Sequence, residues 1–213
     1  MIYFVSGTDT DVGKSVATGF LARRLAARGM RVITQKLVQT GCSGIADDIK
    51  THRKIMGIDF LPEDLDFTTC ADVYAFPCSP HLAAEMEGKS FDYDAAARRT
   101  TLLASRYDAV LVEGAGGLMV PLSGDFLTID YIAKYSLPLY LVASSKLGGL
   151  NHALLSLEAC ARRGIEVAGV VYNTFAAAPK VIEQSTADFI KKYLSKNMPR
   201  AEFIEMGDIS GLL

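Results

Sequence analysis

The sequence predicts an α/β protein with a doubly wound, mostly parallel sheet, helices on both faces and a phosphate-binding loop. Short apolar runs alternate with amphipathic stretches from end to end, which is the rhythm of strand–helix–strand units. Several runs are continuously apolar, as in parallel strands buried on both faces. A glycine loop ending in Gly13, Lys14 and Ser15 joins the first run to the first amphipathic stretch, where folds of this class hold phosphates.

The individual elements follow from the limits of each apolar run and each amphipathic stretch. The first helix places Val16, Phe20 and Leu25 on one face, and Gly29 stands where a helix-ending glycine belongs. Residues 58–79 mix prolines with acidic residues, so we expect mostly irregular structure there. We expect strands at 2–5, 32–35, about 72–76, 109–113, 139–143 and 167–172, and helices at 15–28, 47–56, 80–87, 93–105, 128–135, 151–163 and 179–194.

Length and composition limit the possible functions. The 213 residues suit one domain spanning 1–213, and half of them are apolar. The formal net charge of −2 provides no basic field for nucleic acid. No apolar stretch of about 18 residues is present, and the N-terminus lacks the charged and apolar regions of a signal peptide. We therefore expect a cytoplasmic protein with no nucleic-acid or membrane partner, and the absence of any CxxC pair among the four cysteines fits a reducing compartment.

Residues 7–15, GTDTDVGKS, form a P-loop motif between a predicted strand and a predicted helix. Five residues separate its glycines where the standard motif has four, and Thr8 occupies the usual position of the first glycine. Lys14 would reach the terminal phosphates of a nucleotide, and the Ser15 hydroxyl would ligate Mg²⁺. The motif predicts nucleotide binding without specifying a reaction.

Acidic residues follow two of the predicted strands. Glu113 ends the strand at 109–113 and precedes the glycine-rich stretch 114–117, so we expect it beside the P-loop as a metal ligand. Asp47 and Asp48 open the next helix, where an aspartate can either cap the helix or bind metal. The residues alone leave both roles open.

Lys36 directly follows the second predicted strand, with Thr40 and Gly41 in the loop after it. Most lysines are solvated surface residues. A lysine at the carboxyl edge of a parallel sheet instead faces the ligand site, so we expect Lys36 to face the phosphates or an anionic substrate.

Six segments together resemble the dethiobiotin synthetase family of biotin biosynthesis over residues 1 to about 175. They are GTDTDVGKS (7–15), KLVQTG (36–41), SPH (79–81), EGAGGLMVPL (113–122), KLGGLNHALL (146–155) and Asn173. The resemblance implies a homodimeric P-loop enzyme that uses ATP, Mg²⁺ and CO₂ to close a ureido ring on 7,8-diaminononanoate. It implies that one substrate amine captures CO₂ as a carbamate. The carbamate oxygen then attacks the γ-phosphate, and the second amine closes the ring as phosphate leaves.

The same resemblance implies residue roles. Lys36 would lie on the carbamate side, Asn173 would read the adenine, and the helix start at 149–151 would receive the substrate carboxylate across the dimer interface. The implied catalytic residues are Lys36, Lys14 and Thr10; the nucleotide-binding residues are Asp11, Val12, Gly13, Lys14, Ser15, Glu113, Gly114, Ala115, Gly116 and Asn173; the Mg²⁺ ligands are Ser15, Asp48 and Glu113; and the substrate-binding residues are Thr40, Gly149, Leu150 and Asn151.

The sequence departs from the family pattern at three places. Leu37 replaces a common proline, Asp11 replaces a common glutamate, and the tail EFIEMGDISGLL (202–213) lacks a proline segment that packs on the base. The resemblance therefore leaves the base preference open, and other nucleoside triphosphates stay possible.

The main alternative is a partner-regulated P-loop ATPase of the partitioning type, which has the same fold class. ATPases of that type carry a second lysine five residues before the lysine of the Gly-Lys pair. In this sequence Asp9 occupies that position. An amide-forming synthetase would need a glutamine-hydrolysing domain for which the chain is short. A non-catalytic nucleotide-binding module would not need Lys36 and Thr40 opposite the P-loop.

Overall fold

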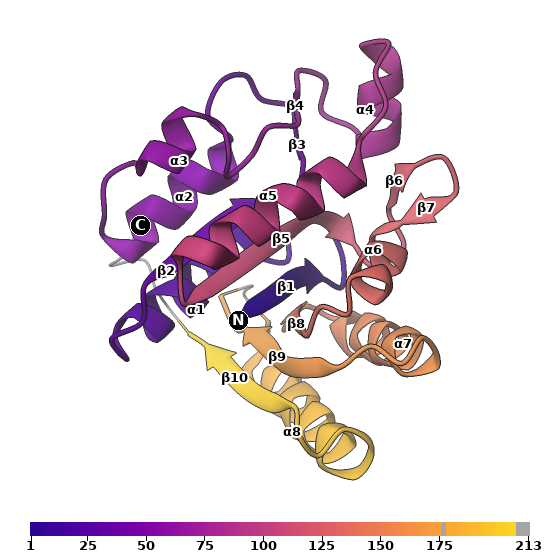
Figure 1. Ribbon diagram of the computed structural model, residues 1–213. Helices are drawn as coiled ribbons and strands as arrows, with labels where there is room; N and C mark the ends of the chain where they lie inside the picture. Colours follow the sequence, from indigo (N-terminus) through magenta and orange to yellow (C-terminus); the bar gives the residue numbers. More distant parts are fainter. Residues whose placement is uncertain (176–177, 208–213) are drawn as a thin grey trace.

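Six parallel strands form the centre of the computed structural model, which describes residues 1–175 and 178–207 (Figure 1). They are β1 Ile2–Gly7, β2 Val32–Lys36, β5 Ala109–Gly117, β8 Leu139–Ser144, β9 Val167–Asn173 and β10 Glu202–Met206. Hydrogen-bonded neighbours follow the order β10-β9-β8-β1-β5-β2. The first strand of the chain therefore lies inside the sheet, and the predicted parallel architecture is confirmed.

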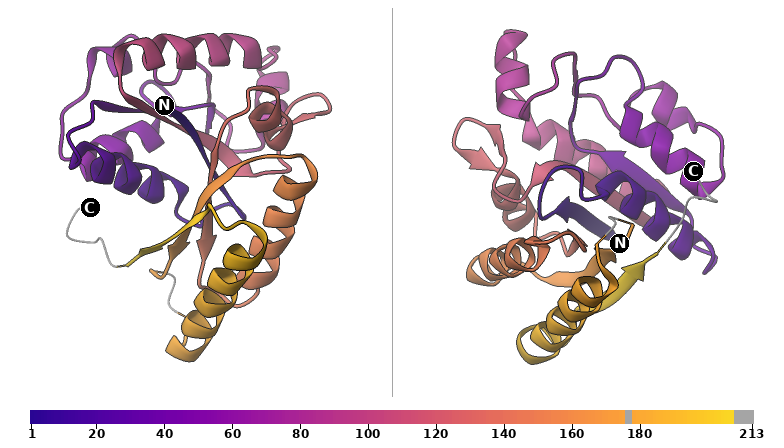
Figure 2. Two further views of the ribbon diagram at one scale, coloured as in Figure 1. Left: turned by 60° about the horizontal axis from the view of Figure 1, so that its bottom comes forward. Right: turned by 180° about the vertical axis from the view of Figure 1, so that it is seen from behind.

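Helices cover both faces of this sheet, as Figure 2 shows from two further directions. They are α1 Lys14–Ala26, α2 Asp47–Met56, α5 Tyr93–Arg106, α6 Thr128–Lys134, α7 Gly149–Arg162 and α8 Lys180–Asn197. Apolar residues of α5, α6, α7 and α8 pack on one face of the strands, and those of α1 pack on the other. The helix α2 lies against α1 and β2. This is the doubly wound arrangement that the sequence predicts.

Smaller elements lie outside the central sheet, most of them at its carboxyl edge. They are β3 Gln39–Thr40, β4 Val73–Tyr74, β6 Pro121–Ser123, β7 Phe126–Leu127, α3 Pro62–Leu65 and α4 Pro80–Met86. Strands β3 and β4 pair in parallel, β6 and β7 form a hairpin, and α4 contacts β6 (Figure 1). All of these except α3 build a rim above the strand ends, whereas Glu63 of α3 accepts from the Tyr107 hydroxyl just before β5 begins.

The register of the sheet places the predicted site residues side by side. Glu113 of β5 is the partner of Val5 in β1 and of Lys36 in β2. Asn173 ends β9 opposite Ser144 of β8. Because parallel strands end at the same edge, these residues meet where the P-loop leaves β1.

The structure corrects the sequence analysis mainly where elements are short or at an edge. The strand β10 was not expected, because its burial alternates along the chain as at a sheet edge, whereas β1, β5, β8 and β9 begin as apolar runs. The helix α3 and the strands β3, β6 and β7 were also not expected, since two to four residues carry no readable periodicity. Residues 208–213 of the divergent tail lie outside the described residues.

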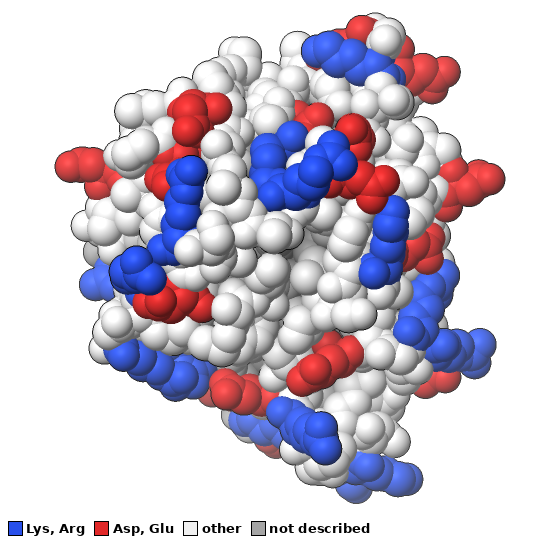
Figure 3. Space-filling model, viewed as in Figure 1, with Lys and Arg blue, Asp and Glu red and all other residues white. Residues whose placement is uncertain are grey.

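The distribution of surface charge and the composition of the helices bear on nucleic-acid and membrane partners. Basic and acidic side chains are interspersed on the face that carries α5 (Figure 3). Among the described residues, none of the helices combines the length and the apolar composition that a membrane span requires.

Candidate active site

The P-loop enters α1 through a glycine that cannot be replaced without strain. Gly13 has a φ of 91°, in the left-handed region that side chains rarely adopt. A Cβ atom on Gly13 would lie 2.5 Å from Nδ2 of Asn173. The same Nδ2 donates to the carbonyl of Val12 at 3.0 Å, while Oδ1 of Asn173 accepts from the backbone N–H of Phe175 at 3.0 Å. Asn173, expected to read a base, thus lies against the P-loop backbone.

Lys14 lies along the P-loop rather than extending from it. Its Nζ donates to the Asp9 carbonyl at 2.9 Å, and the side chain of Asp9 pairs with Lys146 at 3.1 Å. Burial, followed by the charge of nearby Lys36, lowers the pKa of the Lys14 ammonium. Carboxylates of the site oppose this shift, so two cations and several anions share a small volume.

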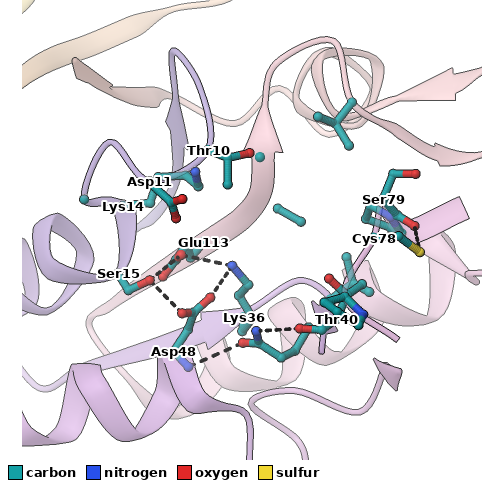
Figure 4. A pocket seen from close by; sticks show the side chains of 18 of the residues that line it. Thr10, Asp11, Lys14, Ser15, Lys36, Thr40, Asp48, Cys78, Ser79 and Glu113 are labelled. Atoms are coloured by element: carbon teal, nitrogen blue, oxygen red, sulfur yellow. Dashed lines mark hydrogen bonds and ion pairs between the residues drawn. The ribbon is translucent and has the colours of Figure 1, made fainter. Parts of the chain in front are cut away.

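Side-chain oxygens of Ser15, Asp48 and Glu113 converge beside the P-loop (Figure 4). The Ser15 Oγ lies 2.7 Å from Oδ1 of Asp48 and 3.0 Å from Oε1 of Glu113. Asp47 instead pairs with the exposed Lys50, and neither aspartate caps α2 through its side chain. Position therefore separates the two aspartates: Asp48 belongs to the site and Asp47 to the surface.

Lys36 is buried at the centre of this cluster, with only 4% of its surface exposed. Its Nζ lies 2.5 Å from Oδ2 of Asp48, 3.0 Å from Oε1 of Glu113 and 2.9 Å from the carbonyl of Gly114. Burial by itself lowers the pKa of this ammonium, but the two carboxylates more than offset it and raise the pKa above its ordinary value. The two carboxylates therefore favour the charged form of Lys36 beside the strand ends.

Glu113 is the most enclosed acid of the site, since its surface is fully buried. Burial raises the pKa of a carboxyl group, but Lys36 and the hydrogen bond from His52 outweigh it and lower the pKa of Glu113 well below its usual range. Nε2 of His52 lies 2.6 Å from Oε2 of Glu113. Sequence reasoning missed His52, because a lone histidine on an amphipathic helix gives no signal beyond its place on the buried face.

A pocket of about 810 Å³ opens between the P-loop and the rim, a size suited to small-molecule ligands. In Figure 4, Thr10, Asp11 and Lys14 lie on one side of it and Thr40, Cys78 and Ser79 on the other. Of the predicted residues, those lining it are Thr10, Asp11, Gly13, Lys14, Ser15, Lys36, Thr40, Asp48, Glu113, Ala115 and Gly116. The sequence analysis assigned no role to the lining residues Val38, Gln39, Pro77, Cys78, Ser79, Pro80 and Val120.

Other predicted residues lie outside this pocket. Gly149, Leu150 and Asn151 form the first turn of α7, after the left-handed Gly148, and are not part of the pocket lining of their own chain. Val12 is a buried residue of the P-loop itself, and the Gly114 carbonyl accepts from Lys36.

The residues present fit a magnesium ion bound together with nucleotide. A hydroxyl and two carboxylates offer oxygen ligands, which Mg²⁺ prefers, and in nucleotide sites one or two carboxylates are completed by phosphates and water. The described residues include no separate cluster of three His, Cys, Asp or Glu side chains that could hold a metal. The oxygen cluster therefore suits a metal that arrives with a phosphate ligand.

Comparison with known proteins identifies the family to which these motifs belong. A family model described as an AAA domain matches residues 2–201. An ATP-dependent dethiobiotin synthetase of Haemophilus ducreyi is 49% identical over 205 residues, which cover 96% of this chain and 97% of that protein. The chain belongs to the dethiobiotin synthetase family. A second dethiobiotin synthetase, from Haemophilus influenzae, is 55% identical over 174 residues, covering 82% and 91% of the two chains.

Similar folds occur among solved structures with much lower identity. A ParA family ATPase from Chlorobium tepidum superposes with a TM-score of 0.57 at 16% identity, covering 99% of this chain and 86% of that one. A pNOB8 ParA bound to nonspecific DNA gives a TM-score of 0.58 at 14% identity, with coverage of 98% and 86%. These likenesses show the fold alone, which this chain shares with a ParA family ATPase.

Proposed function

We propose that the protein forms dethiobiotin from 7,8-diaminononanoate and CO₂ with ATP as co-substrate and Mg²⁺ as the nucleotide's metal. The observation that carries the proposal is the position of Lys36. Its buried ammonium lies in the pocket between the P-loop and Thr40. A carbamate oxygen must meet the γ-phosphate at such a place, and both groups are anionic.

The chain's own residues can supply positioning and charge neutralisation, which phosphoryl transfer chiefly needs. Lys14 and the P-loop N–H groups would hold the phosphates, and Thr10 and Asp11 would lie over them. Lys36 would neutralise the carbamate, and Thr40 would hold the substrate on the opposite wall. Ser15, Asp48 and Glu113 would hold Mg²⁺, which supplies further charge neutralisation when bound. Placing the two anions in contact is the main catalytic task.

The proposal extends to the assembly and location of the enzyme. Gly149, Leu150 and Asn151 lie outside the pocket of their own chain, at a helix N-terminus suited to a carboxylate. In a homodimer they would contribute to the pocket of a second copy. We propose a cytoplasmic homodimer of single-domain subunits, and an active monomer in sedimentation experiments would contradict it.

The test is product formation by purified protein. We expect dethiobiotin, detected by mass, from 7,8-diaminononanoate, bicarbonate, Mg²⁺ and ATP, with parallel reactions that contain each other nucleoside triphosphate. Omitting bicarbonate or the triphosphate should abolish the product. Folded protein that binds nucleotide but forms no product with any triphosphate would refute the proposal and favour a partner-regulated ATPase.

Lys36→Ala separates the role of this lysine from nucleotide binding. We expect it to abolish dethiobiotin formation while nucleotide binding, measured by calorimetry, survives. Loss of nucleotide binding in a folded variant would instead assign Lys36 to the nucleotide.

A further inference from the structure

A chain of buried hydrogen bonds connects the Glu113 carboxylate to a second ion pair behind the site. His52 of α2 lies between Glu113 and Thr34, and none of the three has measurable exposure. Its Nε2 is 2.6 Å from Oε2 of Glu113, and its Nδ1 is 3.0 Å from the Thr34 hydroxyl. The imidazole therefore has one identified contact at each nitrogen.

The direction of this chain follows from the groups at its two ends, an arginine that only donates and a carboxylate that only accepts. Nη1 of Arg53 donates to the Thr34 Oγ1 at 2.8 Å, and Arg53 is itself held by Asp64 through Nε and Nη2, each at 2.7 Å. An arginine can only donate, so Thr34 accepts from it and has its own proton left to donate. The ionised Glu113 carboxylate can only accept, so its contact with Nε2 of His52 requires a ring proton on Nε2, and Nδ1 can then accept the proton of the Thr34 hydroxyl.

The two oxygens of Glu113 thereby have separate tasks. Oε2 faces His52, whereas Oε1 lies 3.0 Å from both the Ser15 Oγ and the Lys36 Nζ. A carboxylate held at one oxygen cannot rotate freely, so the other oxygen keeps a fixed direction toward the site. Groups that orient a metal-binding side chain in this way commonly change metal affinity 10- to 100-fold when they are removed.

We propose that His52 is a positioning residue whose Nε2–H fixes the Glu113 carboxylate so that Oε1 faces the metal and Lys36. The inference rests on the proposed function in assigning Glu113 to the metal of the nucleotide. It adds a residue of α2, and through it Thr34 and Arg53, to the groups that set the geometry of the site.

Three substitutions at one position distinguish donation from filling of space. His52→Gln can place an amide N–H close to the position of Nε2, His52→Asn reaches only the position of Nδ1, and His52→Leu has no donor. The matched control is Ile55→Val, which removes one buried methylene from the same helix and changes no polar group of the site.

The binding experiment measures the affinity of Mn²⁺ by electron paramagnetic resonance in the presence of a non-hydrolysable ATP analogue. We expect His52→Leu and His52→Asn to weaken Mn²⁺ binding about 10- to 100-fold, His52→Gln to restore most of the affinity, and Ile55→Val to match the parent. Equal affinity in all variants, or a His52→Gln variant as weak as His52→Leu, would overturn the proposal.

A second measurement needs no metal and reads the tautomer of His52 in the parent protein. The chain has three histidines, so the His52 signals in long-range ¹H–¹⁵N spectra are those lost in one of its variants. We expect the tautomer with the proton on Nε2, and a proton on Nδ1 alone would overturn the proposal. Neither measurement requires turnover, so failure to form dethiobiotin would refute the proposed function and leave this test in place.

Discussion

Replacing Lys36 by methionine would remove the cation from a buried cluster of three charges while keeping the apolar stem. The Nζ lies 2.5 Å from Asp48 and 3.0 Å from Glu113. At an effective dielectric constant of about 20, each contact corresponds to a Coulomb attraction of about 5–7 kcal/mol. Burial of Lys36 and Glu113 offsets much of this attraction, while Asp48 keeps 22% of its side chain exposed, and loss of one partner from a buried pair typically costs about 3–5 kcal/mol.

We therefore expect Lys36→Met to lower the free energy of unfolding of the ligand-free protein by about 3–5 kcal/mol. In a chain of this size the melting temperature would fall by roughly 6–20 °C. Denaturant titration and calorimetry, both without Mg²⁺ and nucleotide, measure the two quantities. The fall should be partly reversed in the double variant Lys36→Met/Glu113→Gln, because the uncompensated buried carboxylate is then gone.

The control for this prediction is Lys50→Met on α2. Lys50 pairs with Asp47 at 2.7 Å, but 47% and 62% of the two side chains are exposed. An exposed pair contributes about 0–1 kcal/mol, so this variant should be nearly as stable as the parent. If Lys36→Met were no less stable than Lys50→Met, the argument from buried charge would be wrong.

Three further predictions test the site from other directions. The free energy of unfolding should fall below about pH 4.5 and above about pH 10.5, because folding lowers the pKa of Glu113 and raises that of Lys36 from these ordinary values. In denaturant titrations at different pH values, Glu113→Gln should reduce the loss of unfolding free energy on the acid side. An unchanged loss would contradict this. Gly13→Ala should abolish nucleotide binding in calorimetry with the circular dichroism spectrum retained, since the added Cβ would collide with Asn173; normal binding would mean that the loop can move aside. Asp48→Asn should raise the Mg²⁺ concentration needed for half-maximal activity about tenfold or more, whereas Asp47→Asn should not, and the reverse order would assign the metal to Asp47.

The sequence was most informative where function depends on the ends of buried strands. Lys36 and Glu113 could be placed at one edge because each stands at the end of a predicted strand, and the register confirms that they are partners. The choice between Asp47 and Asp48 could not be made, since adjacent helix residues point in different directions that depend on how α2 packs. His52 could not be found, because its role depends on a hydroxyl and a carboxylate from two different strands.

The central position of β1 has a consequence for how the protein is made. Its partners in β5 and β8 lie about 110 and 135 residues further along the chain. At 5–20 residues per second, a ribosome needs roughly 5–30 s to reach them. The P-loop is therefore synthesised early but completed late, after β9 has brought Asn173 beneath Gly13. Until then the apolar strand lacks its neighbours, and nucleotide has no complete P-loop to bind during the early steps of folding.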